Sequence, residues 1–140
     1  GVSAVDVSGA GGTTWVGVEA LRGDEESSRV GQALWSWGVP TAASLLWARD
    51  ADIVSIASGG VRDGLDVARA LAVGATLAGA ALPFLRALDV SPEALDLELR
   101  VWLRTLRTVM ALTASPSVGA LRRAPRVIGE RLARWESAGR

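Results

Sequence analysis

Short apolar runs of strand length alternate along this chain with longer runs of helical spacing, and glycine stands at the joins. The runs that predict strands are residues 3–7, 53–57 and 76–82. Those that predict helices are residues 30–37, 41–49, 64–73 and a segment from 92 onward. Because no hairpin turn joins the strands, the alternation predicts an α/β fold with a parallel sheet, either an open doubly wound sheet or part of a barrel.

The helix boundaries are marked by capping residues. Asp63 can cap the helix that ends at Gly74, and residues 91–93 (Ser-Pro-Glu) combine a cap, a proline in the first turn and an early carboxylate. Residues 24–28 are polar and predict a loop. The long helix from 92 onward is expected to have one apolar face, and the arginine-rich tail beyond Ser115 to be surface or interface. The residues of that apolar face are Leu95, Leu99, Trp102, Leu103, Leu106 and Met110.

The residue types that the chain lacks exclude several kinds of chemistry. All 15 basic residues are arginine, and there is no lysine, histidine or cysteine. Thiolate and imidazole catalysis, metal sites built on those ligands and Schiff-base chemistry are therefore excluded for this chain alone. A chain so poor in proton-transfer groups is expected to take its chemistry from a cofactor. No catalytic side chain and no metal ligand can be named.

Charge and hydropathy bear on partners and location. The formal net charge is zero, so neither nucleic acid nor an anionic membrane surface is indicated. The longest uncharged stretch, residues 70–85, is too short to span a bilayer. The N-terminus lacks the basic region of a signal peptide, and its strand-like start suggests a cut end.

Two glycine-bearing loops follow predicted strands. The first, residues 8–15 (SGAGGTTW), nearly fits the dinucleotide fingerprint, but the third glycine would fall at Thr14. The second, residues 58–64 (SGGVRDG), precedes a helix N-terminus, where unpaired amides and the helix dipole favour a phosphate. Residues 80–83 (AALP) then end the next strand with small side chains. Ordinary flexible or tight turns are the alternative for both loops, but two such successive strand ends match the phosphate site of many barrels.

The six tryptophans and Arg62 are further candidates for contact with a ligand. Trp15 lies in the first glycine loop and is a candidate for ligand contact, whereas the other five are expected in the core or at subunit contacts. Arg62 could pair with a phosphate or with a surface carboxylate, and its loop favours the phosphate.

Three segments resemble a known family. Residues 5–15 (VDVSGAGGTTW) and 37–45 (WGVPTAASL) resemble segments of the type 2 isopentenyl-diphosphate isomerases. Residues 57–68 (ASGGVRDGLDVA) with 72–75 (AVGA) are shared more widely among FMN barrels and alone could indicate a 2-hydroxy-acid oxidase. The first two segments favour the isomerase.

This resemblance implies a cytoplasmic, homo-oligomeric enzyme that interconverts isopentenyl and dimethylallyl diphosphates with FMN and Mg²⁺, the flavin being reduced by NADPH. It implies that residues 1–140 are one segment, about strands 6–8 of a (β/α)8 barrel followed by C-terminal helices. Trp15 would lie against the flavin or the substrate. The residues expected to contact FMN are Ser8, Thr13, Gly60, Val61, Arg62, Ala81 and Leu82.

The extent of the chain is its departure from the family. A barrel of this kind needs about 250 residues, so the N-terminal half, with the family's Mg²⁺ carboxylate and its flavin-contacting lysine, would lie upstream or on another chain. The alternative functions are an FMN-dependent oxidoreductase and a non-catalytic half-barrel remnant that binds FMN or serves only in assembly.

Overall fold

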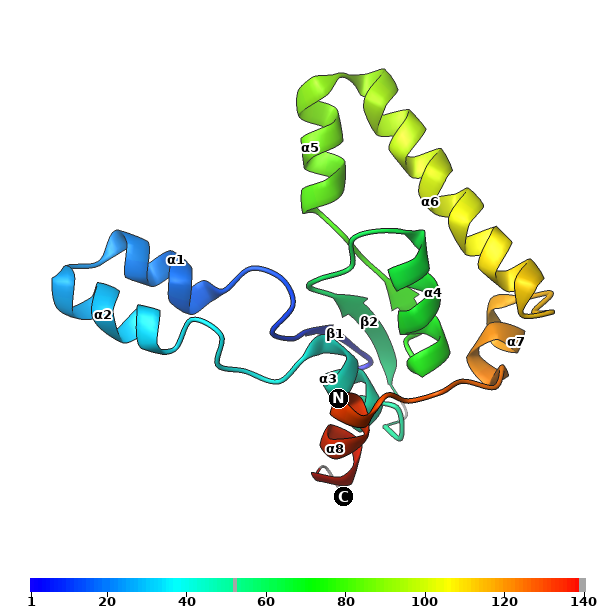
Figure 1. The fold of residues 1–140 in the computed structure, drawn as a ribbon, viewed down its shortest axis with the longest axis horizontal. Coiled ribbons are helices and arrows are strands. Elements are labelled where there is room, and N and C mark those ends of the chain that lie inside the picture. Colours follow the sequence, from blue (N-terminus) through cyan, green and yellow to red (C-terminus); the bar gives the residue numbers. More distant parts are fainter. Residues whose placement is uncertain (52, 139–140) are drawn as a thin grey trace.

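The computed structural model describes residues 1–51 and 53–138. In this part of the chain, three parallel strands form one sheet in the order β1-β2-β3, and the other regular elements are helices (Figure 1). The predicted α/β fold with a parallel sheet is therefore confirmed. The elements are β1 (Ala4–Ser8), α1 (Trp15–Arg22), α2 (Glu25–Ala33), α3 (Thr41–Ala48), β2 (Val54–Ser58), α4 (Gly64–Val73), β3 (Leu77–Ala78), α5 (Leu82–Val90), α6 (Pro92–Leu112), α7 (Val118–Arg123) and α8 (Glu130–Ala138).

One face of the sheet is covered and the other is open. Ala57 of β2 is fully buried with Leu45 of α3 and Ala70 of α4, so these helices pack on one face. On the other face, Asp6 is in register with Ile56 and Ile56 with Leu77, which is 54% exposed. Side chains alternate along a strand, so Asp6, Ile56 and Leu77 lie on the face opposite Ala57. The described residues leave this second face uncovered.

Helix α4 is the best-capped helix next to the sheet. The Asp63 carboxylate accepts a hydrogen bond from the Asp66 amide at 2.8 Å, as predicted for its N-cap, and Gly74 ends the helix with φ +136°. A second small core forms on its outer side, where Leu121 of α7 is 2% exposed. The tail beyond Ser115 is exposed or half-buried at its other described residues, as expected of a surface segment, and Leu121 is the position that packs with Ala68 and Leu71 of α4.

The third strand is shorter than the sequence predicts. The apolar run of residues 76–82 pairs with β2 only at Leu77 and Ala78, and Leu82 is already the first residue of α5. Pro83 explains the difference, because a proline lacks the amide needed inside a sheet but is well suited to the first turn of a helix. Helix α5 was not predicted.

Residues 24–28 do not form the predicted loop. Asp24 caps α2, and its carboxylate accepts a hydrogen bond from the Ser27 amide at 2.9 Å. Two glutamates follow in the first turn, where their negative charges interact favourably with the positive end of the helix dipole. Helix α2 ends at Ala33, so the predicted helix over 30–37 begins earlier and ends earlier than expected.

Of the five tryptophans expected in the core or at subunit contacts, Trp102 is in the core. Trp102, 7% exposed, lies against Phe84 with ring centroids 4.6 Å apart, but Trp37 is 80% exposed. Trp47 packs edge-on against Trp135 and donates a hydrogen bond to its carbonyl at 2.9 Å, which holds α8 on α3. On α6, Trp102 is buried as predicted. Two residues of the predicted apolar face, Leu99 and Leu103, are exposed instead. None of the helices within the described residues is long and apolar enough to cross a membrane.

Candidate functional site

The loops that follow β1 and β2 pack backbone against backbone. A Cβ atom built on Gly12 would lie 2.6 Å from the Gly59 Cα, and one built on Gly60 would lie 2.6 Å from the Gly11 carbonyl oxygen. No side chain fits at such distances. We call these residues, Gly11, Gly12, Gly59 and Gly60, the glycine junction. It forms where the carboxyl ends of two adjacent parallel strands meet.

The segment before α3 closes the same junction. The Ala10 amide donates to the Val39 carbonyl at 2.8 Å, and the Thr41 hydroxyl donates to the Gly59 carbonyl at 2.7 Å. Residues 5–15, 37–45 and 57–68, which are separate in the sequence, therefore come together in one place. This is the arrangement that their shared resemblance to one family leads one to expect.

The turn between β2 and α4 presents free backbone amides. Gly59 and Gly60 have φ values of +71° and +89°, which lie in the left-handed region that favours glycine. Among the described residues, the amides of Gly60 and Val61 have no hydrogen-bond acceptor. Unpaired amides next to a helix N-terminus fit a phosphate oxygen, so these two residues could hold the FMN phosphate.

Arg62 is placed differently from its neighbours. Its amide donates to the Asp66 carboxylate at 3.3 Å, and Asp66 in turn pairs with Arg69 at 3.1 Å. The Arg62 amide is therefore already hydrogen-bonded to a carboxylate, unlike the amides of Gly60 and Val61. The Arg62 side chain is exposed and extends from the same turn, so any contact with a phosphate would come through its guanidinium.

A second pair of free amides lies at the start of α5. Ala81 is the N-cap of this helix but supplies no side-chain oxygen, and among the described residues the amides of Ala81 and Leu82 have no acceptor. The preceding Gly79 lies beside Ser58, since a Cβ there would be 3.9 Å from the Ser58 Cβ. The ends of β2 and β3 are thus neighbours, each leading to a helix N-terminus.

The β1 side contributes Ser8 and a residue that the sequence reasoning missed. A Cβ on Gly59 would lie 2.8 Å from the Ser8 hydroxyl oxygen, so Ser8 touches the glycine junction. Thr13 lies in the same loop and is exposed. The Ser58 hydroxyl donates to the Asp6 carboxylate at 2.6 Å across the paired strands. Strand alternation could have found Asp6, because it places Asp6 on the same face as Ser8.

Trp15 is not part of the loop but the first residue of α1. Its side chain is 74% exposed and lines a hollow of about 570 Å³ between α1 and α2, with Val16 and Val30. The two helices pack on each other and project from the sheet (Figure 1). Ligand contact by Trp15 therefore stays a prediction.

Within the described residues, no three carboxylates, histidines or cysteines gather where they could hold a metal ion. The carboxyls whose pKa values are clearly lowered are those of Asp24 and Glu93, each of which caps or opens a helix. Backbone amides, hydroxyls and the Arg62 guanidinium are the groups of this site that can bind and orient an anion, and Asp6 holds the Ser58 hydroxyl.

Parallel strands whose glycine-rich ends lead into helices define a class of α/β proteins that bind phosphate groups at the carboxyl edge of the sheet. Sequence comparison agrees with this class: residues 1–127 match the family of FMN-dependent dehydrogenases. The chain belongs to that family.

Individual relatives in the comparison are named for one particular enzyme. The chain is 47% identical to an isopentenyl-diphosphate delta-isomerase of Archaeoglobus fulgidus, over 96% of the chain and 39% of the relative. It is 40% identical to that of Thermoplasma volcanium over 96% and 40%, and 49% identical to that of a Synechococcus strain over 88% and 36%. The predicted resemblance is confirmed. The chain spans less than half the length of these relatives.

Proposed function

We propose that the chain supplies the FMN-phosphate-binding part of an enzyme that interconverts isopentenyl and dimethylallyl diphosphates. The observation that carries the proposal is the glycine junction. It joins residues 5–15 to residues 57–68, the segment before α3 is hydrogen-bonded to it, and next to it lie free amides at a helix N-terminus. The names of the relatives support the reaction, and the name of the family supports the cofactor.

The residues of the chain would bind and orient the cofactor. The amides of Gly60, Val61, Ala81 and Leu82 would donate hydrogen bonds to the phosphate oxygens, with the Arg62 guanidinium as a countercharge. Ser8 and Thr13 would contact FMN from the first loop, and Trp15 would cover the flavin or the hydrocarbon part of the substrate. When bound and reduced, the flavin would supply the proton-transfer chemistry for which the chain has no histidine, lysine or cysteine.

The rest of the enzyme would come from residues outside this sequence. The open face of the sheet and its unpaired edges at β1 and β3 suit a sector, about strands 6–8, of a (β/α)8 barrel. Residues that hold Mg²⁺ and the substrate diphosphate would lie in the other sectors. NADPH would reduce the flavin, and the assembly would be a cytoplasmic homo-oligomer.

An FMN-dependent oxidoreductase is the second candidate, because the matching family is named for dehydrogenases. Product analysis separates the two. The complete protein, with FMN, NADPH and Mg²⁺, is given isopentenyl diphosphate in one assay and a series of 2-hydroxy acids in another. Dimethylallyl diphosphate supports the isomerase. Oxidation of a hydroxy acid without isomerisation would support the oxidoreductase. FMN binding without either product would support a non-catalytic role.

The 140-residue chain alone is expected to be inactive. With a sheet face and two edges uncovered it should associate or aggregate, although part of the phosphate site is present. The same isomerase assay on the purified chain checks this expectation. Dimethylallyl diphosphate above background would show that this barrel sector alone catalyses the isomerisation.

A further inference from the structure

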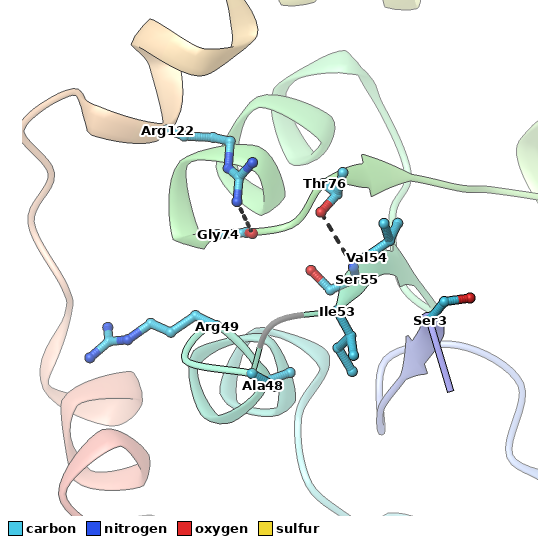
Figure 2. Close-up of a pocket in the computed structure, with 10 residues that line it drawn as sticks. Ser3, Ala48, Arg49, Ile53, Val54, Ser55, Gly74, Thr76 and Arg122 are labelled. Atoms are coloured by element: carbon cyan, nitrogen blue, oxygen red, sulfur yellow. Dashed lines mark hydrogen bonds between the residues drawn. The ribbon is translucent and has the colours of Figure 1, made fainter. Parts of the chain in front are cut away.

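Four arginines line a hollow at the end of the sheet opposite the glycine junction. The hollow has a volume of about 340 Å³ and lies between the ends of α3 and α4 and the helix α7. A second hollow of about 430 Å³ adjoins it, shares Arg49, Gly74 and Arg122, and reaches Ser3, Val54 and Thr76 at the amino ends of the strands (Figure 2). We call the first the arginine hollow; its basic residues are Arg49, Arg122, Arg123 and Arg126.

The positive charge there is largely uncompensated. Arg49 pairs with Glu136 at 2.9 Å and with Asp50 at 3.6 Å. Asp50 is the single carboxylate among the residues that line the arginine hollow. Among the described residues, neither Arg122, Arg123 nor Arg126 forms an ion pair with a carboxylate. In a chain of zero net charge, this is a marked local excess.

Two of these guanidinium groups are held in place by backbone carbonyls. Arg122 donates through Nη2 to the Gly74 carbonyl at 3.1 Å, as Figure 2 shows, and Arg126 donates through Nη1 to the Arg122 carbonyl at 3.4 Å. Each such bond uses one of the five N–H groups of an arginine, so further donors stay available. Arranged donors of this kind lose less entropy on binding than free side chains do.

We propose that the arginine hollow binds a phosphoryl group, as free phosphate or as the phosphate of a small ester. Guanidinium forks match the geometry of phosphate oxygens, and several of them converge here from α7 and its neighbours. The proposal does not depend on FMN. The hollow and the glycine junction lie at opposite ends of five-residue strands, which span roughly 17 Å.

The test is calorimetric titration of the complete protein, saturated with FMN, with inorganic phosphate or methyl phosphate at constant ionic strength. The double variant Arg123→Gln/Arg126→Gln should bind both anions about tenfold more weakly. The matched control, Arg104→Gln/Arg107→Gln, removes the same charge from exposed positions of α6 and should leave the affinity unchanged. Retention of FMN by both variants reports that they are folded.

Each outcome bears on the proposal. If methyl phosphate binds as well as phosphate, the recognised group is the phosphoryl group of a metabolite; binding of phosphate alone supports a site for the free ion. Phosphate titration of a Gly60→Val variant without FMN separates this site from the junction, and binding should persist there. The proposal is overturned if millimolar phosphate shows no saturable binding, or if both double variants lose affinity equally.

Discussion

The glycine junction and the helical hairpin of α1 and α2 both rely on glycine for close approach, but they do so differently. In the junction, the nearest atom that a Cβ on Gly11, Gly12 or Gly60 would meet belongs to backbone, and Gly59 and Gly60 have left-handed φ values. In the hairpin, Gly17 and Gly31 lie in helices, and the nearest obstacles are the side chains of Thr14 and Ala20. The two packed helices can separate to make room, whereas backbone at the ends of two paired strands cannot.

The two regions also differ in what surrounds them. The junction lies at the ends of two paired strands and is tied to the segment before α3 by hydrogen bonds at Ala10 and Thr41. The hairpin projects from the sheet and exposes large apolar side chains, among them Leu21 at 80%. A substitution in the junction should therefore disturb cofactor binding, while one in the hairpin should disturb the hairpin itself.

The largest effect is expected at Gly60. A Gly60→Val variant places a Cβ against the Gly11 carbonyl and forces a β-branched residue to φ +89°, a strain on the order of 1–3 kcal/mol before any clash. The complete protein should lose FMN on purification, which the flavin absorbance measures.

Gly129→Val is the matched control, since a Cβ there meets nothing within 4 Å. A yellow Gly60→Val protein with the FMN affinity of the control would show that the phosphate does not bind at this turn.

A smaller effect is expected at Trp15. If its indole covers the flavin or the substrate, Trp15→Ala should lower kcat/KM by about tenfold, ~1.4 kcal/mol, with little change in melting temperature because the side chain is 74% exposed. Trp37→Ala, an equally exposed tryptophan outside α1, is the control. Unchanged kinetics with a lowered melting temperature would make Trp15 a packing residue.

Gly31 tests the hairpin directly. Leucine at Gly31 would overlap Ala20 on α1, so α1 and α2 must separate at a cost of about 1–3 kcal/mol. Trypsin should then cleave after Arg22 or Arg29 several-fold faster, while FMN binding is unchanged. Ala33→Leu, on an exposed position of α2, is the control. Equal cleavage in both variants, or loss of FMN from Gly31→Leu, would break the distinction between the two regions.

The sequence predicted the junction better than the hairpin, for a physical reason. Strand alternation, the Asp63 cap and the glycine loop at 58–64 are local signals, and each gave the correct element. Leu82 was misplaced because a continuous apolar run does not distinguish a strand from the first turn of a helix, and Pro83 was the available clue.

In the hairpin, the polarity of residues 24–28 suggested a loop, although the same residues cap and open α2. Contacts across the sequence, such as Thr41 with Gly59 and Asp6 with Ser58, depend on the register of β1 and β2. No local pattern contains that register. For the same reason, neither the excess positive charge at Arg122 and Arg126 nor its position at the far end of the sheet could be read from the arginine-rich tail.

The smallest effect is expected at the cap of α2. Hydrogen bonds from Ser27, backbone amide first, lower the pKa of the exposed Asp24 carboxyl below its ordinary value of 3.8. A pKa that is lower in the folded than in the unfolded chain stabilises the helix at pH values above the unfolded pKa. That contribution is lost as the pH falls through the folded pKa.

Helix α2 should therefore fray on acidification below the ordinary aspartate pKa, and amide exchange at Ser27 and Ser28 is the measurement. Asp24→Asn keeps a capping oxygen but cannot titrate at this position, so it should show less acid-induced fraying at these amides. Asp24→Ala should be frayed at neutral pH already, because it removes the acceptor. FMN binding should be the same in all three proteins, since the cap lies in the hairpin and not in the glycine junction. If Asp24→Asn frays with acid as the parent does, another group controls the pH response, and the cap is not its cause.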